Sequence, residues 1–139
     1  MTGRADIGEQ KTMLIVDDHP LLRRLMREFL QSAYPGCSLR EAADGAGALE
    51  ACLSHRPRLV LMDIGLPDAN GIELTARLRT LYPGLPVIVV SQKSGEEYVQ
   101  QALAAGARAY VSKDHILTDL IPAVAAAIGV LPATDMGAS

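Results

Sequence analysis

Residues 13–20 read MLIVDDHP, and the pattern that they begin recurs along the whole chain. A short apolar run leads directly into two acids, Asp17 and Asp18, and Pro20 then ends the run. An apolar run of this length predicts a buried strand, and proline suits the first turn of a helix. Because neighbouring carboxylates repel each other, a strand that ends in two of them indicates that a cation lies nearby.

Expected strands and helices alternate after this first stretch. We predict strands at 12–18, 37–44, 58–63, 85–91 and 108–113, and helices at 20–33, 45–56, 71–82, 95–107 and 116–128. Strand–helix repeats imply parallel strands joined by right-handed crossovers, with helices on both faces of one sheet. The predicted fold class is therefore α/β, a doubly wound parallel sheet, with MLIV and LVLM as the most central strands. Pro122 is unfavourable inside the last predicted helix.

Size and composition limit the classes of function. The 139 residues are 49% hydrophobic and 21% charged, which is typical of one globular domain. A formal charge of −3 provides no basic face for nucleic acid, and no apolar run approaches the roughly 20 residues that span a bilayer. The N-terminal residues lack the apolar core of a signal peptide, and Cys37 and Cys52 are too few for a disulfide scaffold or a zinc site. We expect a cytoplasmic protein that contacts neither nucleic acid nor membrane.

Reactive side chains stand at the carboxyl ends of four predicted strands. They are Asp17, Asp18, Asp63, Ser91 and Lys113. In an open parallel sheet the functional crevice lies beyond these strand ends. Three carboxylates raise one another's pKa unless a cation offsets them, and Mg²⁺ fits because it binds through one or two carboxylates and leaves sites for phosphate oxygens. The pattern predicts a Mg²⁺ site that receives a phosphoryl group, with the lysine and serine as further contacts.

Each of these residues has a simpler interpretation when it is taken alone. An acid after a strand most often caps the next helix, a serine is usually a loop residue, and a lysine is usually solvated. Tyr110 alone indicates a half-buried strand aromatic with its hydroxyl in water, and His19 a loop residue that faces solvent. Only their joint placement favours the phosphoryl site. The chain contains no nucleotide-binding or hydrolase motif of the types GxxxxGK[ST], GxGxxG, HExxH or GxSxG.

The segments IVDDHPLLR, LVLMDIGLPDANGIEL, VIVVS and AYVSKD resemble the receiver domain of bacterial two-component response regulators. The resemblance covers residues 12–129 and leaves 1–11 and 130–139 as flexible tails. It implies a flavodoxin-like (βα)5 sheet with strand order 2-1-3-4-5. It also implies that Asp63 accepts a phosphoryl group from a sensor histidine kinase or a phosphotransfer protein. Such a domain is not an enzyme beyond its own phosphorylation and dephosphorylation.

The same resemblance implies roles for the other site residues. Mg²⁺ would be held by Asp17, Asp18, Asp63 and the backbone carbonyl of Gly65. Lys113 would pair with the phosphoryl group, and Ser91 and Tyr110 would turn toward it as a switch. Pro67 and Gly71 match the residues that shape the loop after the phosphoacceptor.

The chain departs from the family pattern at three places. Asp114 follows Lys113 where the family commonly has proline after a cis bond, and a cis bond before another residue costs about 2.5–4 kcal/mol. Gln92 is larger than the residue usually found there. Gly65 and Lys93 occupy positions that commonly tune the lifetime of the phosphate.

Two surfaces follow from the resemblance. The first predicted helix presents Leu21, Leu22, Leu25, Met26 and Phe29, with Arg23, Arg24 and Arg27 between them. Most of the apolar side chains should be core, and an exposed edge could dock the kinase. Helix 95–105 and strand 109–112 resemble the region through which receivers form homodimers.

The segments DDHPLLRRLM, SKD and GVLPA resemble the subfamily with a LuxR/NarL/FixJ-type helix-turn-helix output domain. Ten residues after 129 cannot form three helices, so we expect control of transcription through a DNA-binding domain absent from this chain. The alternatives are a stand-alone receiver that acts by protein–protein interaction, a degenerate receiver that only binds proteins, and a Mg²⁺-dependent phosphohydrolase with Asp63 as transient nucleophile. The intact acid, serine and lysine set argues against a degenerate receiver. A hydrolase would need a second acid, for which only Asp68 is spare, and a lid, for which no insertion is long enough.

Overall fold

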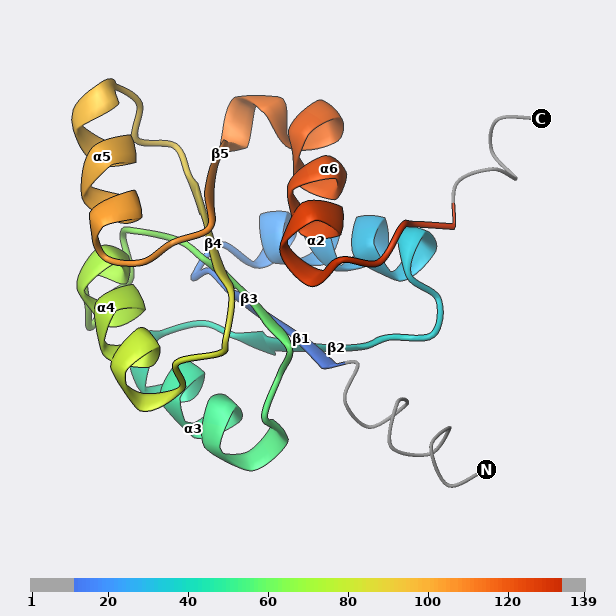
Figure 1. Cartoon of the computed structure of the whole chain (residues 1–139), viewed down its shortest axis with the longest axis horizontal. Helices are drawn as coiled ribbons and strands as arrows, with labels where there is room; N and C mark the ends of the chain where they lie inside the picture. The colour runs from blue at the N-terminus through green and yellow to red at the C-terminus, as the bar shows by residue number, and fades with distance from the viewer. Residues whose placement is uncertain (1–11, 134–139) are drawn as a thin grey trace.

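The computed structural model describes residues 12–133 (Figure 1). The strands are β1 (Thr12–Val16), β2 (Ser38–Ala42), β3 (Leu59–Met62), β4 (Val87–Ser91) and β5 (Ala109–Ser112). The helices are α2 (Pro20–Ala33), α3 (Gly45–His55), α4 (Gly71–Leu81), α5 (Glu96–Ala104) and α6 (Ile116–Ile128), with a 3₁₀ helix, η1 (Lys113–His115), before α6. The predicted tail 1–11 and residues 134–139 of the second tail lie outside the described residues. No helix within 12–133 is long and apolar enough to cross a membrane.

The five strands form one parallel sheet in the order β2-β1-β3-β4-β5, which confirms the predicted fold class and strand order. Helices α2 and α6 cover one face of the sheet, and α3, α4 and α5 cover the other (Figure 1). β3 is the middle strand. Both of its neighbours, β1 and β4, are buried along their whole length, so VIVVS is as enclosed as MLIV.

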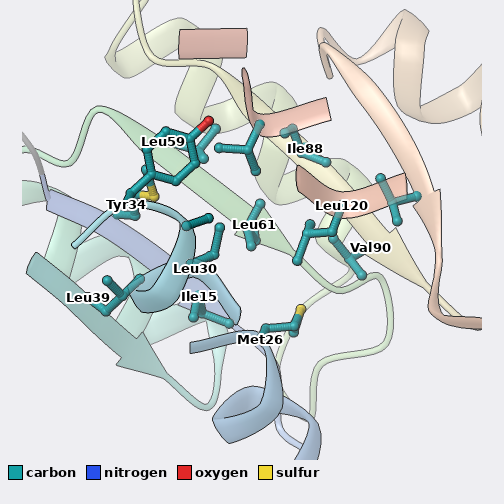
Figure 2. Packing of buried hydrophobic residues seen from close by; sticks show 14 of the residues in the cluster. Ile15, Met26, Leu30, Tyr34, Leu39, Leu59, Leu61, Ile88, Val90 and Leu120 are labelled. Atoms are coloured by element: carbon teal, nitrogen blue, oxygen red, sulfur yellow. The ribbon is translucent and has the colours of Figure 1, made fainter. Parts of the chain in front are cut away.

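Alternation of side chains along β1 and β3 explains why these strands are apolar throughout. Ile15 and Leu61 pack with Met26, Leu30 and Leu120 on the face covered by α2 and α6 (Figure 2). The residues between them point to the other face and pack against α3 and α4; they are Leu14, Val16, Val60 and Met62. With both faces covered, neither strand has a solvent side that would favour polar residues.

Helix α2 has the predicted bounds but a narrower buried face than the sequence indicated. Met26 is buried and Leu22 and Phe29 are partly buried, whereas Leu21 and Leu25 are 72% and 41% exposed. The last helix also has the predicted bounds and runs through Pro122, which has no amide proton to donate to the carbonyl four residues earlier. An apolar edge of α2 therefore faces solvent.

The chain after α6 returns across the end of α2. The Tyr34 hydroxyl donates to the Val130 carbonyl at 2.8 Å, and the Ala133 amide donates to the Ala33 carbonyl at 2.8 Å. These two bonds fix the direction in which the chain leaves the α2–α6 face.

The loop between β3 and α4 folds tightly beneath the end of the sheet. The Gly71 amide donates to the Ile64 carbonyl at 2.7 Å, and Gly65 pairs with Asn70 as an isolated bridge. A Cβ atom on Gly71 would lie 1.8 Å from the Asp63 carbonyl oxygen, a distance that no side chain can tolerate. Glycine at this position therefore allows the backbone of the loop to pack directly against the backbone carbonyl of Asp63.

We expect Gly71→Ala to lower the free energy of unfolding by about 3 kcal/mol, because the clash involves backbone that cannot move without the sheet. The better helix propensity of alanine would offset only about 1 kcal/mol of this. Gly84→Ala is the control, since a Cβ atom there meets no atom within 4 Å and should change stability by less than about 0.5 kcal/mol. Urea unfolding measures both variants, and equal losses for the two would contradict this explanation.

Candidate functional site

The register of the sheet brings the predicted acids together. The Asp17 amide donates to the Ala42 carbonyl and the Asp63 amide to the Val16 carbonyl, both at 3.0 Å, so each acid extends its strand by one residue. A cleft of about 410 Å³ opens at this edge. It is lined by Asp18, His19, Asp63, Gly65, Ser91, Gln92, Lys93 and Lys113. Of the predicted site residues, only Asp17 and Tyr110 do not line the cleft directly, and both lie beside residues that do.

Lys113 lies between two buried carboxylates. Its Nζ is 2.9 Å from Asp17 Oδ2 and 3.3 Å from Asp63 Oδ2, and all three side chains are at most 9% exposed. The other oxygen of Asp17 accepts a hydrogen bond from the His19 amide at 2.8 Å, and Asp63 Oδ1 accepts one from the Ile64 amide at 2.9 Å. Each buried carboxylate is thus held on one side by backbone and on the other by the ammonium.

One ammonium does not balance the negative charge of this site. Carboxylate oxygens of Asp17, Asp18 and Asp63 all lie within 4.8 Å of one another. Burial, followed by the charge of Asp17, raises the pKa of Asp63, while Lys113 and the Ile64 amide act in the opposite direction. Oxygen donors at this spacing suit a hard divalent cation, and because Asp18 is exposed, such an ion could keep several of its waters.

In metal-free buffer we expect Asp63→Asn to raise the free energy of unfolding at neutral pH. The pKa of Asp63 is higher in the folded protein than in the unfolded chain, so ionising this carboxyl destabilises the fold. The destabilisation is absent below the unfolded pKa of about 3.9 and grows as the pH rises through the folded pKa. Urea unfolding across that pH range should show that the free energy of unfolding of Asp63→Asn exceeds that of the wild type by an amount that shrinks as the pH falls. A gain that stays constant with pH would contradict this assignment.

Ser91 and Tyr110 meet at the backbone of Lys93. The buried Ser91 hydroxyl accepts from the Lys93 amide at 3.0 Å, and the Tyr110 hydroxyl donates to the Lys93 carbonyl at 2.6 Å. Tyr110 is half-buried as its isolated interpretation predicted, but its hydroxyl is bonded to protein rather than only to water. Burial is also the main reason that the pKa of Tyr110 is raised. A movement of Ser91 would therefore reach Tyr110 through one residue.

The loop after β5 contains no cis bond. All described peptide bonds are trans, including that between Lys113 and Asp114. The Ser112 hydroxyl accepts from the Asp114 amide at 3.1 Å and so caps η1, which carries Lys113 toward the cleft. Serine capping thus provides the turn at the position where the resemblance implied a proline.

Asp68 lies outside the acidic cluster. Its carboxylate accepts hydrogen bonds from the Gly45 and Ala46 amides at 2.7 and 3.1 Å, and these bonds lower the pKa of Asp68. It therefore adds to the capping of α3, whose N-cap residue is Asp44, from the loop that follows β3. A group held in this way as an anion is unsuited to donate a proton to a leaving group at the cleft.

Comparison with known proteins identifies relatives of this chain by sequence. The family model described as the response regulator receiver domain matches residues 13–125. The probable transcriptional regulatory protein TcrX of Mycobacterium tuberculosis is 36% identical over 118 residues, which are 85% of this chain and 49% of that protein. The nitrate/nitrite response regulator protein NarL of Escherichia coli is 34% identical over 84% of this chain and 54% of its own length. The chain spans about half the length of the curated relatives that it matches.

Solved structures agree with the sheet order. A two-component response regulator of the LuxR family from Aurantimonas sp. SI85-9A1 superposes with a TM-score of 0.79 at 30% identity, covering 88% of each chain. A CheY-like response regulator receiver domain protein from Methanospirillum hungatei JF-1 gives a TM-score of 0.78, also at 30% identity, covering 86% of this chain and 94% of that one. The likeness extends over almost all of the described residues.

Proposed function

This chain belongs to the response regulator receiver domain family of two-component systems, and from that membership we propose that it accepts a phosphoryl group on Asp63 with Mg²⁺ bound and then changes conformation to control an output. The observation that supports this most strongly is the position of Asp63. Its carboxylate lies in an open cleft, beside a buried ammonium and within 4.8 Å of the carboxylate oxygens of two further acids. A divalent cation that receives a phosphoryl group would offset the repulsion among these acids.

We propose that Asp63 is the nucleophile of the transfer. One of its carboxylate oxygens forms a bond to phosphorus while the bond from phosphorus to the nitrogen of the donor phosphohistidine breaks. Asp17, Asp18, Asp63 and the Gly65 carbonyl would hold Mg²⁺. When bound, Mg²⁺ would neutralise charge on the transferring oxygens, which is the main requirement of phosphoryl transfer. Lys113, already 3.3 Å from Asp63, supplies the protein's own positive charge.

The proposed switch starts at the Ser91 hydroxyl. An acyl phosphate adds about −1.5 to −2 charges and three acceptor oxygens, if it behaves like other phosphorylated side chains. Ser91 would then donate to a phosphoryl oxygen and release the Lys93 amide. Because Tyr110 is bonded to the same residue, the loop and this aromatic would move together. A new surface near β5 would present that change to a partner.

Mass spectrometry tests the proposed reaction directly. The chain is incubated with acetyl phosphate in Mg²⁺ or in EDTA, and its intact mass is measured. We expect the mass of one phosphoryl group to be added in Mg²⁺ and not in EDTA. No added mass in either buffer, or equal labelling in both, would contradict the proposal.

Partners follow from the family. Receiver domains interact with histidine kinases or phosphotransfer proteins, and we propose that the exposed Leu21 and Leu25 on α2 form the docking edge. They line a shallow groove with His19 and Asp114 next to the cleft. Several relatives are named as transcriptional regulators or activators, so we propose a transcriptional output through a segment outside this chain, with residues 12–129 as the receiver unit in the cytoplasm. A stand-alone receiver remains the alternative, whereas a phosphohydrolase is disfavoured because Asp68 caps α3.

A phosphoryl mimic should raise the solution mass of the chain from monomer to dimer. We propose that α5 and β5 form the contact, since Leu103 on α5 is 48% exposed and β5 carries Tyr110. Light scattering after size-exclusion chromatography, with beryllofluoride and Mg²⁺, measures the mass. Leu103→Asp should prevent the increase, whereas Leu53→Asp on α3, at a 63% exposed leucine, should not. An unchanged wild-type mass would contradict this interface.

A further inference from the structure

Arg23 joins the acid pair to two other elements of the fold. Its amide donates to the His19 carbonyl at 3.0 Å in the first turn of α2, directly after the acids. Its guanidinium then reaches back: Nη1 donates to the Asp17 carbonyl and Nε to Glu41 Oε1, both at 2.7 Å. One side chain thus links α2, the end of β1 and β2.

This link is stronger than an ordinary surface ion pair. The Arg23 and Glu41 side chains are only 18% and 24% exposed. The hydrogen bond from Arg23 is the largest of the causes that lower the pKa of Glu41, so the glutamate stays ionised and orients the guanidinium. Charge-assisted bonds of this length are about twice as strong as neutral ones, and partial burial limits their screening by salt.

The link bears on the direction of the Asp18 carboxylate. Asp17 is held at its amide, its carbonyl and both carboxylate oxygens, and the carbonyl contact is the one that Arg23 supplies. Asp18 is exposed, and its carboxylate forms no hydrogen bond or ion pair within residues 12–133. Nothing holds that side chain except the backbone of residues 17–19. Where Asp18 points therefore depends on how firmly Arg23 fixes the residue before it.

We infer that Arg23 is a positioning residue for the divalent ion: by fixing the Asp17 carbonyl against α2 and Glu41, it aims Asp18 into the cleft. The inference rests on the proposed function, because it takes Asp17 and Asp18 as metal ligands. Partners that orient the ligands of a metal typically contribute a factor of about 10–100 to its affinity. Arg23 never touches the ion in this scheme, so its removal should weaken binding and leave the ligand set intact.

Arg27 provides a matched control. It sits one turn further along α2, and its Nη1 donates to Glu41 Oε2 at 2.8 Å, but it makes no contact with Asp17. Isothermal titration of the whole chain with MgCl₂ compares wild type, Arg23→Gln and Arg27→Gln. We expect Mg²⁺ affinity to fall about tenfold or more in Arg23→Gln and to stay within about twofold of wild type in Arg27→Gln. Affinities that fall equally would assign the effect to Glu41 and overturn the inference.

A metal-free measurement keeps this test separate from the proposed function. Amide hydrogen exchange in EDTA reports how firmly residues 17–19 are held before any ion binds. We expect faster exchange of this segment in Arg23→Gln than in Arg27→Gln, with the core strands unchanged in both. If wild type fails to bind Mg²⁺, the proposed function fails, while the exchange result still decides whether Arg23 fixes the loop. Unchanged exchange at 17–19 in Arg23→Gln would overturn the inference.

Discussion

Asp63→Asn should acquire no phosphoryl group from acetyl phosphate in Mg²⁺, under conditions in which the wild-type chain is labelled. Asparagine has nearly the same shape, and its oxygen can still accept the hydrogen bond from the Ile64 amide. Its amide is a far weaker nucleophile than a carboxylate, and it also removes one of the anions proposed to hold the metal. The variant should therefore fold and fail only in the chemistry.

The control for this variant is Asp68→Asn. Asp68 belongs to the same loop, but its carboxylate accepts from the Gly45 and Ala46 amides at the start of α3, so its replacement should leave labelling unchanged and lower the stability only slightly. Intact mass spectrometry follows both variants over the same time course. Labelling of Asp63→Asn at the wild-type level would place the acceptor elsewhere and remove the basis of the proposed function.

Lys113→Gln should reduce the initial rate of labelling by about 100-fold or more, which is the usual cost of losing a preorganised donor at the position where charge develops. The ammonium lies 2.9 Å from Asp17 and 3.3 Å from Asp63, so its loss leaves these two buried carboxylates to repel each other. The pKa of Asp63 would rise further, because Lys113 is the main group that lowers it.

Magnesium binding separates this role of Lys113 from a general loss of structure. The proposed metal ligands are unchanged in Lys113→Gln, so calorimetric titration should still detect bound Mg²⁺. Lys113→Arg keeps the charge but replaces a compact ammonium with a planar fork, and its labelling rate should lie between those of Lys113→Gln and wild type. A Lys113→Gln rate within threefold of wild type would show that the lysine has no part in the transfer.

Most of the fold could be predicted from the sequence because the strands that matter are apolar throughout. β1, β3 and β4 are covered on both faces, and burial of this kind leaves a signal in every residue of the strand. The acids after β1 and β3 could be placed together for a simple geometric reason, since parallel strands end at one edge. The strand order itself came from the family resemblance and was confirmed by the structure.

The contacts that support the site were harder to predict. In the sequence Arg23 is only one of three arginines between the apolar residues of the first predicted helix, and nothing in a one-dimensional pattern shows that its side chain returns to Asp17 and Glu41. The bonds through Lys93 involve backbone groups, which carry no residue-type signal at all. Leu21 and Leu25 shared the apolar spacing of the core residues on α2, yet both are exposed in the fold. Such contacts depend on distances between elements, which periodicity does not give.

Placing an ion and a phosphoryl mimic in the cleft tests the central claim most directly. A crystal grown with Mn²⁺ and beryllofluoride allows the metal to be located by its anomalous scattering. We predict one Mn²⁺ ion bound by Asp17, Asp18, Asp63 and the Gly65 carbonyl, with beryllofluoride attached to the Asp63 carboxylate and contacted by Lys113 and Ser91. A cleft that holds neither group at saturating concentrations, or a metal bound away from Asp63, would contradict the account.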